Sequence, residues 1–252
     1  MEEDFSKRND SVSLVLIDHT LATPEENLAL DEAMLLESEE VGGDAPLEIL
    51  RFWESPSHFV VLGVADRYHD SVHVEACARD SIPVLRRSSG GGTVLQGPGC
   101  LNYSLVLSLE TRPELRLIDR SYAVILETIA SALGGTQSVD FQGISDLSVG
   151  NLKISGNAQK RKKRTLLHHG TLLYGFEATL ITRYLQEPEK QPDYREQRRH
   201  ADFVVNLELS VTDIKARLTT AWDAAISVDR QIPSLEDLIA EKYGNPDWTE
   251  RF

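Results

Sequence analysis

The chain has 252 residues, of which 41% are hydrophobic, and its formal net charge is −14. This length and composition suffice for one sizeable core, so we expect a single domain. The negative charge excludes a general nucleic-acid binder, because such proteins carry a basic face that attracts phosphates. No stretch approaches the roughly 20 apolar residues that a membrane span requires. Binding of one small nucleotide stays compatible with the charge, since it needs only a local cationic cluster.

The cysteine content and the N-terminal residues bear on the cellular compartment. Cys77 and Cys100 are the two cysteines, which is too few for a disulfide framework, and they form no CxxC pair. The sequence begins Met1-Glu2-Glu3-Asp4, which is acidic and lacks the apolar core of a signal peptide. We therefore expect a cytoplasmic protein with a flexible tail at residues 1–12 and one domain at residues 13–252.

The first part of the chain is predicted to alternate between short strands and helices, from the period of its apolar residues. In chain order the predicted elements are a strand at 13–17, a helix from Pro24 to the Gly42-Gly43 pair, strands at 47–53 and 58–62, a helix at 73–80 and a strand at 82–85. The runs 47–53 and 58–62 are separated by Ser55-Pro56-Ser57, which suggests a hairpin-like pair.

The rest of the chain continues this pattern. The predicted elements are a strand at 101–109, a helix at 119–133 capped by Gly134-Gly135, strands at 146–149, 152–155 and 166–174, and helices at 179–185, 211–226 and 234–243. Gly150-Asn151 between two short strands is a strong hairpin signal. Strands joined by short turns, with helices interspersed, favour an α+β fold with a mixed, mainly antiparallel sheet.

Two glycine-rich segments stand out between Arg86 and Gly170. The first reads Arg86-Arg87-Ser88-Ser89-Gly90-Gly91-Gly92-Thr93, and the second reads Lys153-Ile154-Ser155-Gly156, with His168-His169-Gly170-Thr171 after it. A Walker A loop requires a lysine directly after its last glycine, whereas Gly92 precedes Thr93. A Rossmann fingerprint requires spaced glycines that open a helix, whereas these glycines are contiguous and precede a predicted strand. Both standard nucleotide loops are therefore excluded.

The residue types in these segments indicate activation of a carboxylic acid by ATP. Lys153 is a compact cation that can bridge the carboxylate and the α-phosphate, and Arg86 can make planar contacts with phosphate oxygens, so these two are the candidate catalytic residues. Glycines 90–92 let the backbone pass close to a ligand. Asp146 is a candidate ligand of Mg²⁺ or of the adenine or ribose group, and the sequence does not separate these roles.

Several ordered blocks of the sequence resemble the lipoate-protein ligases of the biotin/lipoate protein ligase superfamily. The matching blocks are Phe59 to Gly63 with the strand and glycine of the acyl tunnel, Arg86 to Gly92 with the RRSSGGG lipoyl-binding loop, Asp146-Leu147 with an acidic pair, Lys153 to Gly156 with the KISG signature, and His168 to Leu173 with the HHGTLL element. The resemblance covers roughly Ser13 to Phe252. It implies a catalytic domain that forms an α+β sandwich, similar to the class II aminoacyl-tRNA synthetase and biotin synthetase cores.

The resemblance also implies an activity and its participants. It implies an enzyme that uses ATP and Mg²⁺ to convert lipoate or octanoate to acyl-AMP and transfers the acyl group to a lysine of a lipoyl-domain protein. Such an acceptor would be a 2-oxoacid dehydrogenase subunit, a glycine cleavage carrier or another lipoate-bearing protein. The residues implied in lipoyl and AMP binding are Gly63, Ser88, Gly90, Gly91, Gly92, Thr93, Asp146, Ser155, Gly156, Ala158, His169, Gly170 and Thr171. Many family members carry a C-terminal accessory domain that this sequence lacks, so either a separate accessory subunit supplies it or the catalytic domain acts alone.

One departure from the family pattern keeps two alternatives open. After the glycine triplet the family reads His-Asp-x-Gly-Asn, whereas this chain has Gln96-Gly97-Pro98-Gly99-Cys100. A thiol there suggests an octanoyl or lipoyl transferase that forms a thioester on Cys100 without ATP. The nucleophile of the related transferases lies elsewhere, however, and residues 138–145 contain no cysteine. A lipoyl-binding homologue without turnover is the third hypothesis, and the presence of both Arg86 and Lys153 speaks against it.

Two further motifs have an ordinary structural explanation beside a functional one. The basic run Lys160 to Arg164 is typical of a solvated turn, because like charges repel, but it would also suit a loop that folds over an anionic ligand. His168 and His169 within a strand place one ring on each face. One of them is therefore predicted to be a core or supporting histidine hydrogen-bonded to backbone. Metal binding is disfavoured, because no cysteine or carboxylate lies nearby with suitable spacing.

Overall fold

Two sheets of unequal size organise the molecule. The computed structural model describes residues 14–43, 45–135, 137–188, 190–227 and 230–252. Within these residues an eight-stranded sheet has the order β11-β1-β2-β6-β10-β9-β8-β7, and a three-stranded sheet has the order β4-β3-β5. The strands of the large sheet are β1 (Leu14–Asp18), β2 (Ile49–Trp53), β6 (Cys100–Ser108), β7 (Asp140–Gln142), β8 (Asp146–Val149), β9 (Leu152–Arg161), β10 (Thr165–Leu173) and β11 (Ala224–Ile226). Those of the small sheet are β3 (Phe59–Leu62), β4 (Val84–Arg86) and β5 (Val94–Gln96).

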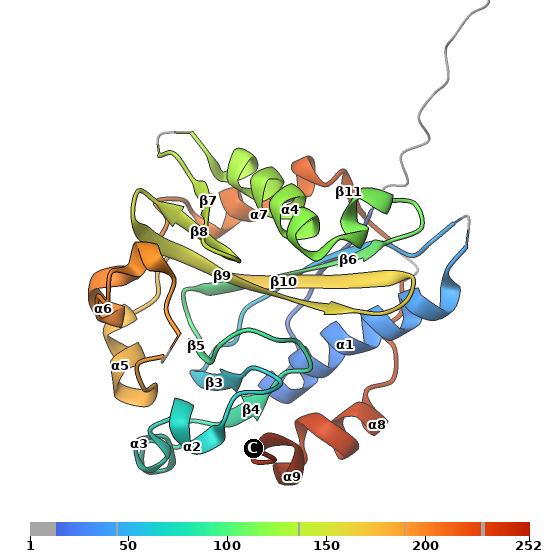
Figure 1. Cartoon of the computed structure of the whole chain (residues 1–252). Helices are drawn as coiled ribbons and strands as arrows, with labels where there is room; N and C mark the ends of the chain where they lie inside the picture. The colour runs from blue at the N-terminus through green and yellow to red at the C-terminus, as the bar shows by residue number, and fades with distance from the viewer. Residues whose placement is uncertain (1–13, 44, 136, 189, 228–229) are drawn as a thin grey trace, which may run out of the picture.

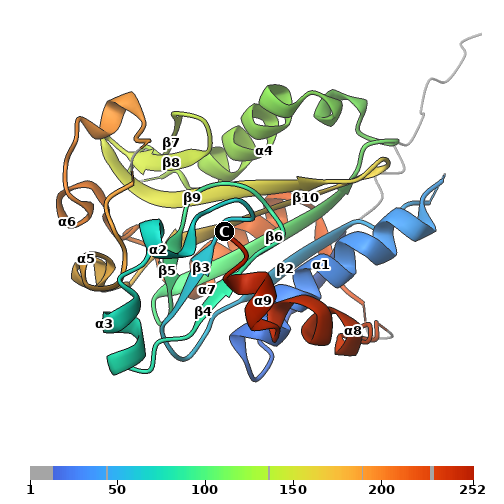
Figure 2. The same ribbon diagram turned by 60° about the horizontal axis from the view of Figure 1, so that its bottom comes forward.

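Helices cover both faces of the large sheet. The α-helices of the described residues are α1 (Pro24–Val41), α2 (Tyr68–Ser71), α3 (Val74–Arg79), α4 (Ile118–Leu133), α5 (Ile181–Tyr184), α6 (His200–Phe203), α7 (Val211–Ala221), α8 (Glu236–Leu238) and α9 (Pro246–Thr249). Figure 1 shows α4 and α7 on one face of the sheet, and α1 with the small sheet on the other. Turning the molecule brings α9 and the C-terminus forward beside the small sheet (Figure 2). None of the described helices combines the length and the apolar character that a membrane crossing would need.

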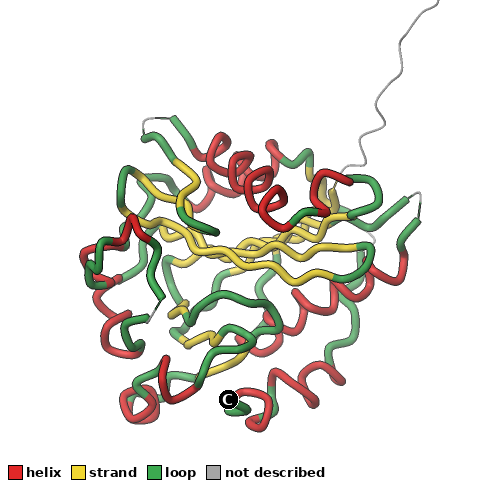
Figure 3. The backbone as a smooth tube through the Cα atoms, viewed as in Figure 1, coloured by secondary structure: helices red, strands yellow, loops and turns green. Residues whose placement is uncertain are grey.

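The strand pairing confirms the predicted α+β class. β1 pairs in parallel with β2 and β11, and the other neighbours in the large sheet are antiparallel. The sheet is therefore mixed and mainly antiparallel, and its long central strands lie between the helices α4 and α7 on one face and α1 with the small sheet on the other (Figure 3). The predicted hairpin is confirmed as β8 and β9, with Gly150 in the turn at a φ of +57° that favours glycine.

Local sequence signals explain the limits of α1. Thr23 precedes the helix and forms a capping box with Glu26, and Pro24 occupies the first turn. The helix ends before Gly42, whose φ is +40°. The predicted boundaries are therefore confirmed at both ends. Asp31 and Glu32 are buried on the face that contacts the sheets, and both matter for the site below.

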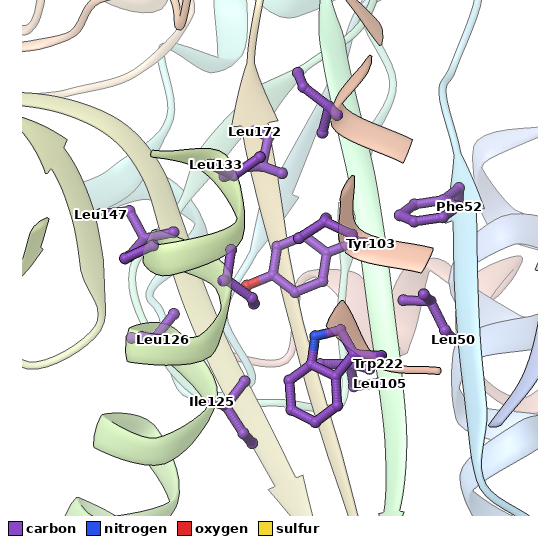
Figure 4. Packing of buried hydrophobic residues seen from close by; sticks show 14 of the residues in the cluster. Leu50, Phe52, Tyr103, Leu105, Ile125, Leu126, Leu133, Leu147, Leu172 and Trp222 are labelled. Atoms are coloured by element: carbon purple, nitrogen blue, oxygen red, sulfur yellow. The ribbon is translucent and has the colours of Figure 1, made fainter. Parts of the chain in front are cut away.

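The main core lies between the large sheet and α4 with α7. Figure 4 shows Tyr103 and Leu105 of β6 facing Ile125 and Leu126 of α4, with Trp222 beside them. Each fully buried side chain of this kind contributes about 1.5–3 kcal/mol relative to an exposed one. Ile125, Leu126 and Ile129 of α4 are fully buried on the face that packs against the sheet.

Two sequence predictions about the elements need correction, and one lies outside the described residues. Runs 47–53 and 58–62 do not form a hairpin, because β2 pairs with β1 and β6 while β3 pairs with β4 and β5 in the other sheet. The predicted helix 211–226 ends at Ala221, and residues 224–226 form strand β11 instead. Residues 1–12 and Ser13, predicted as a flexible tail and the start of a strand, lie outside the described residues.

Candidate active site

The segment between β4 and β5, residues 88–93, is here called the glycine loop, and it is folded around Arg87. The Arg87 guanidinium donates from Nη2 to the carbonyl oxygens of Gly90 at 2.6 Å and Gly92 at 2.9 Å. Its Nε donates to Ser89 Oγ at 3.1 Å. Burial lowers the pKa of Arg87 to about 10, against the opposing influence of Asp66, so the side chain stays charged at neutral pH. The loop is therefore held by an internal cation.

The directions of these carbonyls determine where the loop's N–H groups point. The C=O and N–H of a trans peptide point in opposite directions. Because the carbonyls of Gly90 and Gly92 point at Arg87, the N–H groups of Gly91 and Thr93 point away from it. Such outward N–H groups are suitable donors for an anion.

A second contact fixes the other side of the loop. A Cβ on Gly63 would lie 1.9 Å from the carbonyl oxygen of Gly91, so the two backbones touch and Gly63 admits no side chain. Gly91 has a φ of +82°, which favours glycine there as well. Thr93 Oγ1 donates to Asp66 Oδ2 at 2.7 Å, and the same oxygen accepts from Gly63 N at 3.2 Å. Gly63 and Thr93 thus position the loop.

Arg86 lies behind the glycine loop and not beside Lys153. Its side chain is fully buried, and burial is the main cause that lowers its pKa. The guanidinium donates to the carbonyl oxygens of Gly63 at 2.8 Å, Asp66 at 2.7 Å and Thr249 at 2.7 Å. These acceptors occupy most of its donors. The structure therefore does not bring Arg86 beside Lys153, and its guanidinium joins the C-terminal segment to residues 63–66.

Lys153 lies on the hairpin that faces the glycine loop. Its Nζ is 2.7 Å from Asp146 Oδ1, and Tyr194 donates its hydroxyl to Asp146 Oδ2 at 2.8 Å. The Lys153 side chain is 28% exposed, so it is neither buried nor fully solvated. A Cβ on Gly156 would be 3.0 Å from Nζ, so this glycine leaves room for the lysine. Burial and the Asp146 charge raise the pKa of Tyr194, which keeps it a donor.

A β-bulge in the β8-β9 hairpin sets the direction of Lys153. Leu147 pairs with Ser155 while Ser148 pairs with Lys153, so Ile154 is an extra residue on β9. One extra residue inverts the alternation of side chains along a strand. Lys153 thereby shares a face with Gly156 and Asp146, whereas Ile154 is buried in the core.

Histidines 168 and 169 face opposite sides of β10, as predicted. His169 Nε2 is 2.6 Å from Ser89 Oγ of the glycine loop, and its Nδ1 is 3.9 Å from Asp31 Oδ2. His168 points into the core, where its ring nitrogens contact Tyr103 and Gln159 side chains and not backbone groups. Burial lowers the pKa of His169 to about 4 and that of His168 to about 3, so both rings are neutral at pH 7.

The face of each strand separates the predicted ligand residues into two groups. Ala158 lies on the site face, because a Cβ on Gly91 would be 3.7 Å from its side chain. Thr171, two residues from His169, shares that face. Ser155 and Gly170 face the core instead. Ser155 Oγ donates to Asn157, and a Cβ on Gly170 would clash with the same side chain, which accepts a hydrogen bond from the core residue Tyr103. Ser155 and Gly170 therefore do not line the site in this structure.

Buried charges on α1 support the site, and sequence reasoning missed their partners. Arg51 Nη1 is 2.6 Å from Asp31 Oδ1, and Ser104 donates to Asp31 Oδ2 at 2.8 Å. Glu32 accepts from Tyr243 at 2.8 Å and from Lys242 at 2.7 Å. Ser88, at the start of the glycine loop, in turn interacts with Tyr243. The only sequence signal for Arg51 was a charge inside an apolar run.

Cys100 lies in an apolar cluster. It is fully buried beside residues such as Leu62, Leu95 and Phe176, and burial raises the pKa of its thiol strongly. A reactive cysteine needs a lowered pKa and access to solvent. Cys77 is buried in the same cluster, on the packed side of α3, and its pKa is raised too.

The basic run 160–164 lies at the opposite end of β9 from Lys153. Lys162 and Lys163 are exposed at the turn between β9 and β10. Arg161 donates to the carbonyl oxygen of Leu115 at 2.6 Å, and the Arg164 backbone N–H donates to Glu39 at 2.9 Å. With a rise of about 3.4 Å per residue, this turn is roughly 30 Å from Lys153. The prediction of a solvated turn is confirmed for Lys162 and Lys163, and the run does not lie beside Lys153.

Comparison with known proteins decides the family. Residues 23–223 match the family model described as the lipoyl protein ligase A/B catalytic domain. The chain belongs to this family. The putative lipoate-protein ligase A of Aeropyrum pernix is 32% identical over 171 residues, which are 67% of this chain and 61% of that protein. The octanoyltransferase LipM of Carboxydothermus hydrogenoformans is 27% identical, over 94% of this chain and 98% of that protein.

Solved structures of family members show the same fold. A bipartite lipoate protein ligase from Thermoplasma acidophilum superposes with a TM-score of 0.74 at 20% identity, covering 95% of this chain and 96% of that one. A lipoate-protein ligase A bound with ATP gives a TM-score of 0.72 at 21% identity, covering 94% and 98%. The chain covers 61% and 48% of the lengths of the ligase A relatives from Aeropyrum pernix and Mycoplasma genitalium.

Proposed function

We propose that this chain is an ATP-dependent lipoate-protein ligase. It converts lipoate or octanoate to acyl-AMP and transfers the acyl group to a lysine of a lipoyl-domain protein. The placement of Lys153 carries the proposal, because its side chain is partly exposed and its ammonium lies beside Gly156, on the face of β9 that the glycine loop covers. Gly156 and Ala158, which lies under Gly91, are two residues or about 7 Å apart along β9.

In the first half-reaction Lys153 brings two anions together. Its ammonium has three donors, of which one is used on Asp146, so two remain for a carboxylate oxygen and an α-phosphate oxygen. The carboxylate oxygen attacks the α-phosphorus, and pyrophosphate leaves with the electron pair of the broken P–O bond. The outward N–H groups of Gly91 and Thr93 stabilise the phosphate charge, as fixed donors do in other sites where charge develops. Asp146 and Tyr194 orient the lysine.

The second half-reaction depends mainly on proximity. The acceptor lysine amine attacks the acyl carbonyl, a C–N bond forms, and AMP leaves with the electrons of the C–O bond while the amine loses its proton to solvent. Lys153 remains beside the carbonyl and stabilises the tetrahedral oxyanion. His169 is neutral, and it holds the loop through Ser89.

A cysteine-dependent transferase is the second candidate, because the match to an octanoyltransferase LipM spans nearly the whole chain. It would use Cys100 as nucleophile and need no ATP. The burial and the raised pKa of Cys100 favour the ligase over this candidate. A lipoyl-binding homologue without turnover is disfavoured because Lys153 is present and its side chain is partly exposed.

Magnesium is the predicted companion of ATP, and Mg²⁺ prefers oxygen ligands such as carboxylates. Among the described residues no group of three or more His, Cys, Asp or Glu side chains could hold a metal ion. Both oxygens of Asp146 are engaged, one by Lys153 and one by Tyr194. These residues do not fit a metal site built by the protein, so no step proposed above depends on one.

We propose a lipoyl-domain protein as the acceptor. The Thermoplasma acidophilum structure is described as a bipartite ligase with its E2 lipoyl domain, which supports an acceptor of this class and a separate accessory subunit. Incubation of the pure chain with ATP and lipoate tests the proposal. Pyrophosphate should appear only when both are present, and an added apo lipoyl domain should gain one lipoyl mass. Labelling from octanoyl carrier protein without ATP would establish the transferase instead. Adenylate without transfer would indicate that the accessory subunit is required.

A further inference from the structure

Two side chains on the segment that follows β10 lie near Lys153 and have no role in the steps above. They are Glu187 and His200, here called the carboxylate–imidazole pair. Residues 204 and 205 take the place of β10 beside β9, because Val204 bridges to Lys153 and Val205 N donates to the Lys153 carbonyl oxygen at 2.9 Å. Helix α6 begins at His200 and ends just before Val204, and Figure 1 shows it beside this end of β9. The pair therefore lies at the same end of β9 as Lys153.

The separation of His200 from Lys153 can be bounded from the backbone. Val204 N donates to the His200 carbonyl oxygen at 3.0 Å, so these two residues are one helical turn, or about 6 Å, apart. Bridged strands are about 4.8 Å apart. The backbones of His200 and Lys153 are thus no more than roughly 11 Å apart, and the Lys153 charge acts on the His200 ring.

A buried arginine holds the carboxylate of the pair in place. The guanidinium of Arg195, which is buried, pairs with Glu187 Oε2, and Glu187 Oε1 accepts from the His200 backbone N–H at 3.4 Å. Tyr194, the residue before Arg195, donates to Asp146. Two consecutive residues thus fix the carboxylate of the pair and the carboxylate that orients Lys153.

The His200 ring is neutral at pH 7. Burial is the main cause that lowers its pKa below the ordinary value of about 6.5, and the charges of Arg195 and Lys153 lower it further. The charge of Glu187 and a backbone hydrogen bond with Gln186 act in the opposite direction. A bond that raises the pKa of an imidazole is one that its N–H donates. Because Nε2 has no partner in the described part of the chain, the hydrogen is on Nδ1 and Nε2 carries the lone pair.

Two hydrogen-bond acceptors therefore face each other without a donor between them. Glu187 Oε2 is 3.5 Å from His200 Nε2, and both atoms offer lone pairs. The Glu187 side chain is 44% exposed and that of His200 is 12% exposed, so the pair is reached from solvent on the carboxylate side. A group with several N–H donors can bond to both atoms. The ammonium of a lysine is such a group, because it has three donors on a flexible four-carbon stem.

We propose that the carboxylate–imidazole pair receives the ammonium of the acceptor lysine, and that His200 takes its proton before the amine attacks. This inference rests on the proposed function and completes its second half-reaction. A lysine ammonium has no lone pair, and at its ordinary pKa of about 10.4 it stays protonated at pH 7. A neutral histidine within hydrogen-bond reach is suited to remove that proton.

The step can be written with its protons and electron pairs. One N–H bond of the ammonium breaks, and the proton passes to His200 Nε2. The freed lone pair forms the C–N bond to the acyl carbon, and AMP leaves with the electron pair of the C–O bond. The nitrogen then loses its second proton to solvent. Glu187 pairs with the imidazolium until it releases its proton in turn.

Ordered water is the competing explanation for the unpaired atoms, since a buried water often satisfies such groups. A water that donates to both Glu187 and His200 would make the pair a structural feature of the segment. Loss of the pair would then slow transfer by the same factor at every pH.

Single-turnover transfer from synthetic lipoyl-AMP to an apo lipoyl domain tests the inference, because it bypasses the first half-reaction. His200→Gln keeps a hydrogen-bonding side chain that cannot take a proton, and it should slow transfer about a hundredfold at pH 7. The deficit should shrink by more than about tenfold at pH 9, where about a hundred times more of the amine is unprotonated without a base. Pyrophosphate release from ATP and lipoate should change less than about threefold. His69→Gln, at an exposed histidine of α2, is the matched control and should transfer at the parent rate at both pH values.

A second variant tests the carboxylate and keeps the histidine. The Glu187 charge raises the pKa of His200, so Glu187→Gln should lower that pKa. The fall in transfer rate that accompanies protonation of His200 should therefore move to lower pH, and KM for the acceptor domain should rise severalfold.

The outcomes separate this inference from the proposed function. Parent transfer at pH 7 in His200→Gln, or a deficit of equal size at pH 7 and pH 9, would overturn the inference while pyrophosphate release still supported the ligase. Transfer from lipoyl-AMP by a parent protein that releases no pyrophosphate would overturn the ligase while the role of His200 stood. If His200→Gln does not fold, the Glu187→Gln profile decides, and a fall in rate at the parent pH would overturn the inference.

Discussion

Two regions of the candidate site are held in different ways. The glycine loop is fixed by the buried guanidinium of Arg87, which donates to two of its backbone carbonyls, while Arg86 behind it holds Gly63 and the C-terminal segment. Lys153 is held by one carboxylate, which Tyr194 orients in turn, and it remains partly exposed. The difference indicates that the loop is a preformed cradle, whereas the ammonium can exchange its contacts when a ligand arrives.

The largest expected effect on activity comes from removing the ammonium group of Lys153. Lys153→Ala should lower adenylate formation by more than about a hundredfold, because one donor to developing charge is typically worth 10²–10³ in rate. The melting temperature should change little, because the lysine is only partly buried. Lys162→Ala at the β9-β10 turn is the matched control and should keep parent activity. Adenylate formation at the parent rate by Lys153→Ala would show that the lysine has another role.

Replacing Arg86, which lies behind the glycine loop, should mainly reduce the stability of the protein. Arg86→Met leaves the carbonyls of Gly63, Asp66 and Thr249 without their charged donor. We expect a loss of about 3 kcal/mol in the free energy of unfolding, measured in urea, with proteolysis near the C-terminal segment. Arg67→Met changes an exposed arginine and should cost under about 0.5 kcal/mol. If an Arg86 variant kept the stability of the parent but no longer bound ATP, the predicted contact between Arg86 and a phosphate would be supported after all.

Two glycine substitutions distinguish a glycine that packing requires from a glycine that leaves room for a ligand at the glycine loop. Gly63→Ala forces a Cβ against the Gly91 carbonyl and should destabilise the protein by about 2 kcal/mol. A Cβ on Gly90 meets no described atom within 4 Å, so Gly90→Ala should keep the melting temperature. If the ligand passes over the loop, Gly90→Ala still raises KM. Parent kinetics in Gly90→Ala would place the ligand elsewhere.

The neutral histidines of β10 predict a pH dependence of stability. The folded protein leaves His168 and His169 unprotonated down to pKa values of about 3 and about 4, whereas in the unfolded chain they take up protons below about 6.5. Unfolding therefore binds protons in this window, and the free energy of unfolding should fall as pH decreases from about 6.5 to about 4. His169→Gln should reduce the slope in denaturation curves. An unchanged slope would mean that His169 is already protonated in the fold.

The smallest effect is expected at the buried thiol. Cys100→Ala should leave ATP-dependent lipoylation within about threefold, and it should cost roughly 1 kcal/mol because it removes one buried atom. Lipoyl transfer to an apo lipoyl domain measures the activity. Complete loss of transfer in a folded Cys100→Ala protein would favour the thioester route.

Sequence reasoning predicted the features that depend on local chemistry. The limits of α1 follow from Thr23, Pro24 and Gly42, and the β8-β9 hairpin follows from the Gly150 turn. The grouping of β2 and β3 into different sheets was not predictable, because it depends on long-range partners such as Asn102 opposite Trp53.

The site was predicted in outline but not in its directions. The motifs placed Lys153, Asp146 and the glycine loop in one region, and the structure brings them to one face. The bulge at Ile154 determines which side chains reach that face, and no residue type in this segment predicts a bulge. The same limit applies to the partners of Arg86 and Arg87, since Arg86 donates to the C-terminal segment and Arg87 to the glycine loop.

Mass spectrometry of the native protein after incubation with ATP and lipoate tests the central claim most directly. The account predicts a noncovalent complex with the mass of lipoyl-AMP, which Lys153→Ala abolishes and Cys100→Ala retains. A covalent acyl adduct on Cys100, formed without ATP and unaffected by Lys153→Ala, would contradict it.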